Sequence, residues 1–350
     1  MKFKYRPEID GLRAIAVISV IIYHAGFELN INNQIYKILP GGFLGVDIFY
    51  VISGYLITYL ILENIKNNTF SFLNFYERRV RRLLPTLFLV IFSSLIAGYA
   101  LMMPNQLKDL AGSAVSSLFF LSNFWFFLTD NYFAEESLLK PLLHTWSLSI
   151  EEQFYIIFPP LLYFLCKNKH KNIKLFFIFL IIGSLTLSSA GSFYYKNLNF
   201  YMLPSRIWEL LVGAFLAHHH FNQKINSKKK GNELIICLAT IFILFPFFVF
   251  NDETPHPSIF TSFTIIGTAT IIYYNNNFGY VKNILSSKLF VGIGLISYSL
   301  YLWHYPIFAF KKIKSQSLSE FDKIELILLT VTLSILSYCI VERPFRNRKL

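Results

Sequence analysis

The amino-acid sequence predicts an all-α polytopic membrane protein with about ten transmembrane helices. The 350-residue chain is 54% hydrophobic and 18% aromatic, with a mean hydropathy of +0.48, so it is more apolar than an ordinary soluble domain. Apolar runs long enough to cross a bilayer recur from end to end, and they are continuous rather than alternating, which excludes a strand barrel. The runs leave no room for a sizeable soluble domain, so we expect a single membrane domain over residues 1–350.

The apolar runs and the basic loops between them predict the topology. The runs lie at 12–29, 42–62, 83–103, 108–128, 147–166, 172–194, 203–220, 232–250, 259–275, 291–310 and 324–341. We expect segment 108–128 to be re-entrant or interfacial, because it contains the small and polar stretches AGSAVSS and SNF and because its crossing would place the basic loop at 167–174 outside. The other runs then span the membrane and place both termini in the cytoplasm.

The net charge of +12 does not predict a nucleic-acid partner, because the lysines and arginines concentrate in the loops assigned to the inner side. Cys166, Cys237 and Cys339 lie near the cytoplasmic ends of their spans without metal-ligand spacing, so we assign them to packing. The HHH tract at 218–220 is read as an interfacial helix cap, and no metal is predicted.

The first helix carries two ionisable side chains on one face. In GLRAIAVISVIIYHAGF, Arg13 and His24 are almost three helical turns apart, or about 16 Å along the axis. An ionisable group inside an apolar segment predicts a functional site, whereas the simpler alternative is a histidine bonded to a neighbouring polar side chain. Glu8, Asp10 and Arg13 form either a salt-bridged helix start or the mouth of a phosphate or cofactor site.

Later segments repeat this pattern of charges within apolar runs. Asp47 lies in the glycine-rich GGFLGVDIFYVISGYL and needs a cation or histidine partner. The arginines of YERRVRRLLP serve as a positive-inside anchor or as a clamp for phosphates. The remaining candidates are His144 and Glu151 in HTWSLSIEEQFY, Arg206 and Glu209 as an i,i+3 pair, and His304 just before Pro306.

The predicted topology places six of these groups in the outer half of the bilayer: His24, Asp47, Glu151, Arg206, Glu209 and His304. Buried charges are costly unless they are paired or hydrated, so their common depth predicts a polar chamber that opens outward. Arg13 and the arginine cluster form a basic mouth at the inner face.

These motifs resemble the acyltransferase 3 family of bacterial membrane O-acyltransferases, which modify surface polysaccharides. The match runs in order through Arg13 and His24, GGFLGVDIFYVISGY, RRVRRLLP, HTWSLSIEEQFY, PSRIWELLVGA, SYSLYLWHYP and VERPFR. The resemblance implies an enzyme of the bacterial inner membrane that moves an acyl group, expected to be acetyl, from cytoplasmic acetyl-CoA to a hydroxyl outside. The implied acceptor is a lipid-linked or surface polysaccharide, with membrane lipids as the other partners.

The resemblance also implies roles for individual residues. His24 is the expected catalytic histidine and Glu151 is the glutamate of the family pattern, while Arg13 and the loop arginines Arg78, Arg79 and Arg82 are expected at the donor. Many relatives with this motif style continue into another span and an SGNH hydrolase-like domain. Here the sequence stops at Leu350, which we read as a stand-alone or truncated form.

General chemistry supports a histidine base for transfer to a sugar hydroxyl. A carboxylate on the other ring nitrogen would hold the tautomer, and we favour Glu151 over Asp47, which is expected to pair with an arginine. His144, Arg206, Glu209 and His304 are expected to bind substrate. Whether His24 acts as a base or is itself acylated stays open, and the alternative function is a proton- or ion-coupled transporter.

Overall fold

A computed structural model describes residues 5–31, 34–129, 139–167, 172–222, 233–274, 279–315 and 318–347. It confirms the predicted all-α membrane class, since helices make up most of this part of the chain and its only strands form one hairpin. Within the described ranges, five helical stretches are long and apolar enough to cross a membrane: Gly42–Lys66, Phe72–Leu101, Ile173–Tyr194, Lys196–Asn222 and Glu320–Arg346. The number of spans and the placement of the termini stay predictions, and parts of the basic loops at 167–174 and 223–232 lie outside the described residues.

The chain divides into two compact units. Unit 1 comprises Met1–Val20, Leu39–Phe70 and Gln153–Leu295, and unit 2 comprises Ile21–Ile38, Ser71–Glu152 and Ile296–Leu350. The boundary falls within helices α1 (Pro7–Ala25) and α6 (Thr145–Lys167). The expectation of a single domain stays a prediction.

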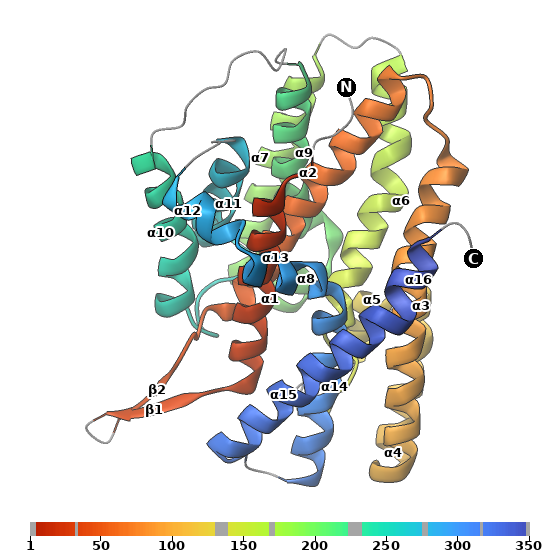
Figure 1. Cartoon of the computed structure of the whole chain (residues 1–350), viewed down its shortest axis with the longest axis vertical. Coiled ribbons are helices and arrows are strands. Elements are labelled where there is room, and N and C mark those ends of the chain that lie inside the picture. The colour runs from red at the N-terminus through yellow and green to blue at the C-terminus, as the bar shows by residue number, and fades with distance from the viewer. Residues whose placement is uncertain are drawn as a thin grey trace. The chain divides into compact units, whose positions relative to one another are not determined.

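Unit 1 is built around the pair α2 (Gly45–Lys66) and α9 (Leu203–Asn222), which lie side by side (Figure 1). A Cβ atom on Gly54 of α2 would overlap the carbonyl oxygen of Leu210, and one on Gly213 of α9 would overlap that of Val51. Helices α2 and α9 therefore approach each other closely at these two glycines. Unit 1 also contains η1 (Gly42–Leu44), α7 (Ile173–Tyr194), α8 (Lys196–Tyr201), α10 (Glu233–Val249), η3 (Ile259–Thr261), α11 (Ser262–Tyr273), α12 (Tyr280–Leu285) and α13 (Lys288–Leu295).

Unit 2 contains α3 (Phe72–Leu101), which contacts both α4 (Pro104–Leu118) and α14 (Ser297–Lys314) (Figure 1). Helix α15 (Glu320–Ser337) packs against α14, where Trp303 Nε1 donates to Ser337 Oγ at 3.1 Å. The π-helix η4 (Tyr338–Glu342) and α16 (Arg343–Arg346) follow it. Strands β1 (Glu28–Ile31) and β2 (Gln34–Lys37) form an antiparallel hairpin in which Glu28 pairs with Lys37.

Segment 108–128 is not one continuous helix. Helix α4 ends at Leu118 and α5 (Ser122–Thr129) begins after Phe120, whose φ of 56° lies in the left-handed region. Small hydroxyl side chains hold this break against α6, because Thr145 Oγ1 lies 2.8 Å from Ser117 Oγ and donates to Ser122 Oγ at 2.9 Å. The polar content that suggested a re-entrant element therefore packs against another helix, and the re-entrant placement stays a prediction.

Two expected helix boundaries were wrong. The run 291–310 is divided into α13 and α14, which meet at Ile296. The arginines of YERRVRRLLP are not in a loop, because α3 already begins at Phe72 after Ser71, whose hydroxyl accepts from the backbone N–H of Asn74. Arginine is a good helix former and Ser71 is a favoured N-cap residue, so the helix extends well beyond the apolar run that predicted it.

Candidate functional site

Unit 2 brings three predicted histidines together. The rings of His24 and His304 have centroids 5.2 Å apart, and His144 and His304 have centroids 5.5 Å apart. Tyr305, which the sequence analysis did not select, contacts all three rings, with its centroid 4.9 Å from that of His24. His144 and His304 are buried, whereas His24 is partly exposed. His24 is therefore the member of this group that another molecule can reach.

Hydrogen bonds order the histidine group. Nδ1 of His304 lies 2.6 Å from the carbonyl oxygen of Tyr301, and Nε2 of His304 lies 3.2 Å from Nδ1 of His24. The hydroxyl of Tyr301 donates to the carbonyl oxygen of His144 at 3.0 Å and lies 2.6 Å from Ser147 Oγ. Tyr301, His304 and Tyr305 of SYSLYLWHYP lie on neighbouring positions of α14, because His304 and Tyr305 follow Tyr301 by three and four residues on one helix. This spacing around His304 is the sequence signal that could have identified Tyr301 and Tyr305.

A second group in unit 2 combines arginines with carboxylates. Arg79 and Arg82 of α3 act electrostatically on the buried carboxylate of Glu152 in α6. Tyr298 of α14 lies within electrostatic range of Glu151 and Glu152, and its hydroxyl donates to the carbonyl oxygen of Leu83 at 2.8 Å. Helical α3 therefore brings Arg79 and Arg82 within electrostatic reach of Glu152, and the expected depths of the arginine cluster and of Glu151 in the membrane stay predictions.

The four clustered arginines are not equivalent. Arg78 is exposed, and Arg81 forms an ion pair with Glu77 at 3.0 Å one turn earlier in α3. Arg79 lies over the ring of Phe75, 5.9 Å from its centroid. Nε of Arg82 is buried without a hydrogen-bond partner among the described residues. The cluster therefore offers one buried, unused donor within the electrostatic network.

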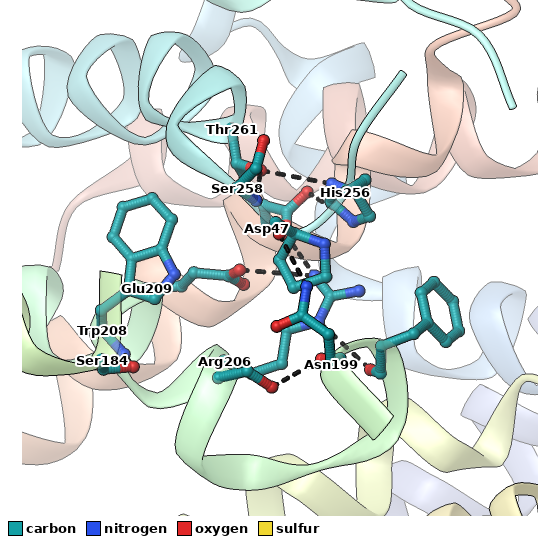
Figure 2. Close-up of polar contacts among 12 residues, drawn as sticks. Asp47, Ser184, Asn199, Arg206, Trp208, Glu209, His256, Ser258 and Thr261 are labelled. Carbon is teal, nitrogen blue, oxygen red and sulfur yellow. Dashed lines mark hydrogen bonds and ion pairs between the residues drawn. The ribbon is translucent and has the colours of Figure 1, made fainter. Parts of the chain in front are cut away.

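Unit 1 holds a third group, centred on Arg206 (Figure 2). Nη1 of Arg206 lies 3.0 Å from Oδ1 of Asp47 and 3.3 Å from Oε1 of Glu209, and all three side chains are fully buried. The predicted i,i+3 pair and the predicted arginine partner of Asp47 are both present. This geometry favours a structural role for the group, and its expected part in catalysis or substrate binding stays a prediction.

His256, which the sequence analysis did not select, lies beside this group. Its Nε2 is 3.8 Å from Oδ2 of Asp47 (Figure 2). Burial and the positive charge of Arg206 hold the pKa of His256 well below its usual value. His256 is therefore neutral near pH 7, and Arg206 supplies the positive charge opposite Asp47.

The start of α1 is salt-bridged, as one of the two interpretations expected. Arg13 Nη1 lies 3.1 Å from Oδ1 of Asp10, and Arg6 Nε lies 2.8 Å from Oε1 of Glu8. The hydroxyl of Tyr5 donates to Oδ2 of Asp10 at 2.7 Å. Partial desolvation, this hydrogen bond and the negative charge of Asp10 raise the pKa of Tyr5 to about 12. A donor-binding role for Arg13 stays a prediction.

The HHH tract lies at the end of α9. The His218 ring accepts a hydrogen bond from Asn222, and Nδ1 of His220 lies 3.2 Å from the hydroxyl of Tyr55. Among the described residues, no group of three or more His, Cys, Asp and Glu side chains has the arrangement of a metal site. Cys166, Cys237 and Cys339 are free thiols.

Together, the apolar helices and the buried histidine and charged groups define a helical membrane protein with ionisable side chains in its interior. Residues 6–341 match the model of the acyltransferase domain family, so the chain belongs to that family. This match identifies the protein as a member of a membrane acyltransferase class. No solved structure matches the chain.

Several curated proteins are similar to nearly the whole chain. It is 35% identical to "Putative O-acetyltransferase SAS0844" of Staphylococcus aureus strain MSSA476 over 99% of its own length. It is 34% identical to "Putative peptidoglycan O-acetyltransferase YrhL" of Bacillus subtilis over 99%, and 37% identical to "Peptidoglycan O-acetyltransferase OatA" of Listeria monocytogenes over 87%. The chain spans about half the length of these relatives, namely 58%, 55% and 49%.

Proposed function

We propose that this membrane protein transfers an acetyl group from cytoplasmic acetyl-CoA to a hydroxyl of a cell-wall glycan on the outer side of the bacterial inner membrane. The observation that carries the proposal is the partly exposed His24, bonded through Nδ1 to the buried His304 in the same unit as the arginine–glutamate network. Acyl transfer to a hydroxyl requires a base that the protein holds in place, and a partly exposed histidine with one ring nitrogen bonded to a buried neighbour meets that requirement.

The proposed reaction uses His24 as a general base. Its Nε2 removes the proton of the acceptor hydroxyl while the hydroxyl oxygen attacks the thioester carbonyl carbon. The bond from that carbon to sulfur then breaks, and the CoA thiolate takes the proton from Nε2. One ester forms and one thioester is consumed, so the histidine returns to its starting state without another reactant.

The donor is proposed to bind through the arginines of α3. CoA carries phosphates, and guanidinium groups recognise phosphates through several parallel hydrogen bonds. Arg82 Nε is a buried donor without a described partner, and Arg79 belongs to the same electrostatic network. Arg78 is exposed and is proposed to add longer-range attraction at the surface.

Peptidoglycan is the proposed acceptor, because two of the similar proteins are named as peptidoglycan O-acetyltransferases.

The test uses purified protein in proteoliposomes loaded with peptidoglycan fragments, with radiolabelled acetyl-CoA supplied on the outside. Wild-type protein is expected to acetylate the enclosed fragments, and His24→Ala is expected to lose at least a factor of about 10² to 10⁴ in rate. His219→Ala is the matched control, because His219 lies on α9 in unit 1 and stacks on Tyr273. Wild-type activity in His24→Ala, or transfer that needs no CoA donor, would contradict the proposal.

A further inference from the structure

A backbone carbonyl determines where His304 carries its hydrogen. Nδ1 of His304 lies 2.6 Å from the carbonyl oxygen of Tyr301, one turn earlier in α14. A carbonyl oxygen only accepts hydrogen bonds, so Nδ1 must be the donor in this contact. In a neutral imidazole the other nitrogen, Nε2, then carries the lone pair.

The neutral form of His304 follows from its surroundings. The side chain is fully buried, and its two ring nitrogens face a carbonyl oxygen and another imidazole rather than a carboxylate. The aromatic rings around it belong to His144, Tyr301 and Tyr305. A buried imidazolium without a negative partner would lose its hydration without compensation.

The hydrogen on His24 follows from the same chain of bonds. Because Nε2 of His304 has a lone pair and lies 3.2 Å from Nδ1 of His24, Nδ1 of His24 must be the donor. The neutral His24 ring then has its lone pair at Nε2. We propose that His304 is a positioning residue that holds His24 in the Nδ1–H tautomer and so reserves its Nε2 as the base, an inference that rests on the proposed function.

In this arrangement His304 holds the tautomer of His24, a role that we expected a carboxylate to have. A histidine in this task differs physically from Glu151 or Asp47, because it accepts the hydrogen bond without bringing a negative charge. The orientation of His24 then depends on α14, where the carbonyl oxygen of Tyr301 and the ring of His304 are held on adjacent turns.

The test compares two replacements of His304. In His304→Gln the amide oxygen reaches the position of Nε2 and accepts from His24, so the tautomer should be kept. In His304→Leu no acceptor remains, and the neutral His24 ring is expected to move its hydrogen to Nε2. Nitrogen-15 NMR of histidine-labelled protein in detergent distinguishes the two tautomers, and the His24→Ala spectrum identifies the His24 signals.

The kinetic prediction is that replacing His304 lowers turnover and leaves donor binding nearly unchanged. His304→Leu should lower kcat by a factor of about 10² to 10⁴ with little change in the KM for acetyl-CoA, as expected when a catalytic histidine takes the wrong tautomer. His304→Gln should stay within about tenfold of wild type, and His219→Leu is the matched control for a histidine-to-leucine change. Each variant is checked for folding by circular dichroism and gel filtration.

The tautomer of His24 and the kcat of the variants test the proposal independently. A wild-type His24 carrying its hydrogen on Nε2 would overturn the proposal, as would an unchanged tautomer or unchanged kcat in a folded His304→Leu protein. If His304→Leu does not fold, the wild-type and His304→Gln spectra still decide the tautomer. An Nδ1–H tautomer in a wild-type protein that transfers no acetyl group would support the bonding of His24 by His304 while removing the proposed function.

Discussion

Arg206 and Asp47 form a fully buried ion pair at 3.0 Å that joins α9 to α2. Glu209 adds a second carboxylate at 3.3 Å from the same guanidinium nitrogen, so one positive charge faces two acidic side chains. Removing one partner of a buried pair is costly because the remaining charge is left uncompensated.

Arg206→Leu is therefore expected to destabilise the protein by about 3 to 5 kcal/mol. Glu209→Gln should cost distinctly less, because Arg206 and Asp47 still pair and the amide fills the same volume. Denaturant unfolding of the purified proteins in detergent, followed by circular dichroism, measures both effects. Equal losses in the two variants would show that the Arg206–Asp47 pair is not the dominant interaction.

The arginines of α3 should differ in their effect on the donor. Arg82→Ala is expected to weaken acetyl-CoA binding by about 1.5 to 3 kcal/mol, because it removes a charged hydrogen-bond donor. Arg81→Ala is the matched control on the same helix, since Arg81 is paired with Glu77. Calorimetric titration with CoA measures the affinity of both variants. Equal affinities would show that Arg82 has a structural role and does not bind the donor.

Two glycines test the contact between α2 and α9. Gly54→Ala should destabilise unit 1 by about 1 to 3 kcal/mol, because the added Cβ overlaps the Leu210 carbonyl oxygen and forces the helices apart. Gly183→Ala in α7 meets no heavy atom within 4 Å and should be neutral or stabilising by up to about 1 kcal/mol. Thermal unfolding midpoints in one detergent compare the pair, and a neutral Gly54→Ala would contradict the close packing described for these helices.

His256 makes the stability of the fold depend on pH. Its pKa is lowered in the folded state by burial and by Arg206, whereas the unfolded chain has the ordinary value of about 6.5. Below that pH the unfolded chain binds a proton that the folded protein excludes, so this part of the stability is present above about pH 6.5 and is lost as the pH falls toward the lowered folded value.

The measurement compares wild type with His256→Asn between about pH 7.5 and about pH 5, on either side of the unfolded pKa. The wild-type free energy of unfolding should fall more steeply with decreasing pH than that of the variant. Asp47, Arg206 and Glu209 remain in both proteins, so their own titration contributes to both slopes. Parallel slopes would show that His256 is protonated equally in the folded and unfolded states.

The sequence by itself determined the class of fold. Continuous apolar runs of bilayer length leave a chain few alternatives to helices, because unpaired backbone groups cannot be tolerated in lipid. Local spacing also sufficed for the Arg206–Glu209 pair and for the Asp10–Arg13 salt bridge at the start of α1, since residues three apart on a helix are neighbours. The need of a buried aspartate for a cation likewise predicted the partner of Asp47 correctly in kind.

Only the tertiary structure decided which side chains meet across helices. His24 and His304 are 280 positions apart in the chain, and no local pattern indicates that Nδ1 of one faces Nε2 of the other. Hydropathy also began the third span at Leu83, whereas the helix starts at Phe72 and brings Arg79 and Arg82 within electrostatic reach of Glu152. The physical reason is that helix rotation and packing determine these contacts, whereas hydropathy records only how apolar a segment is.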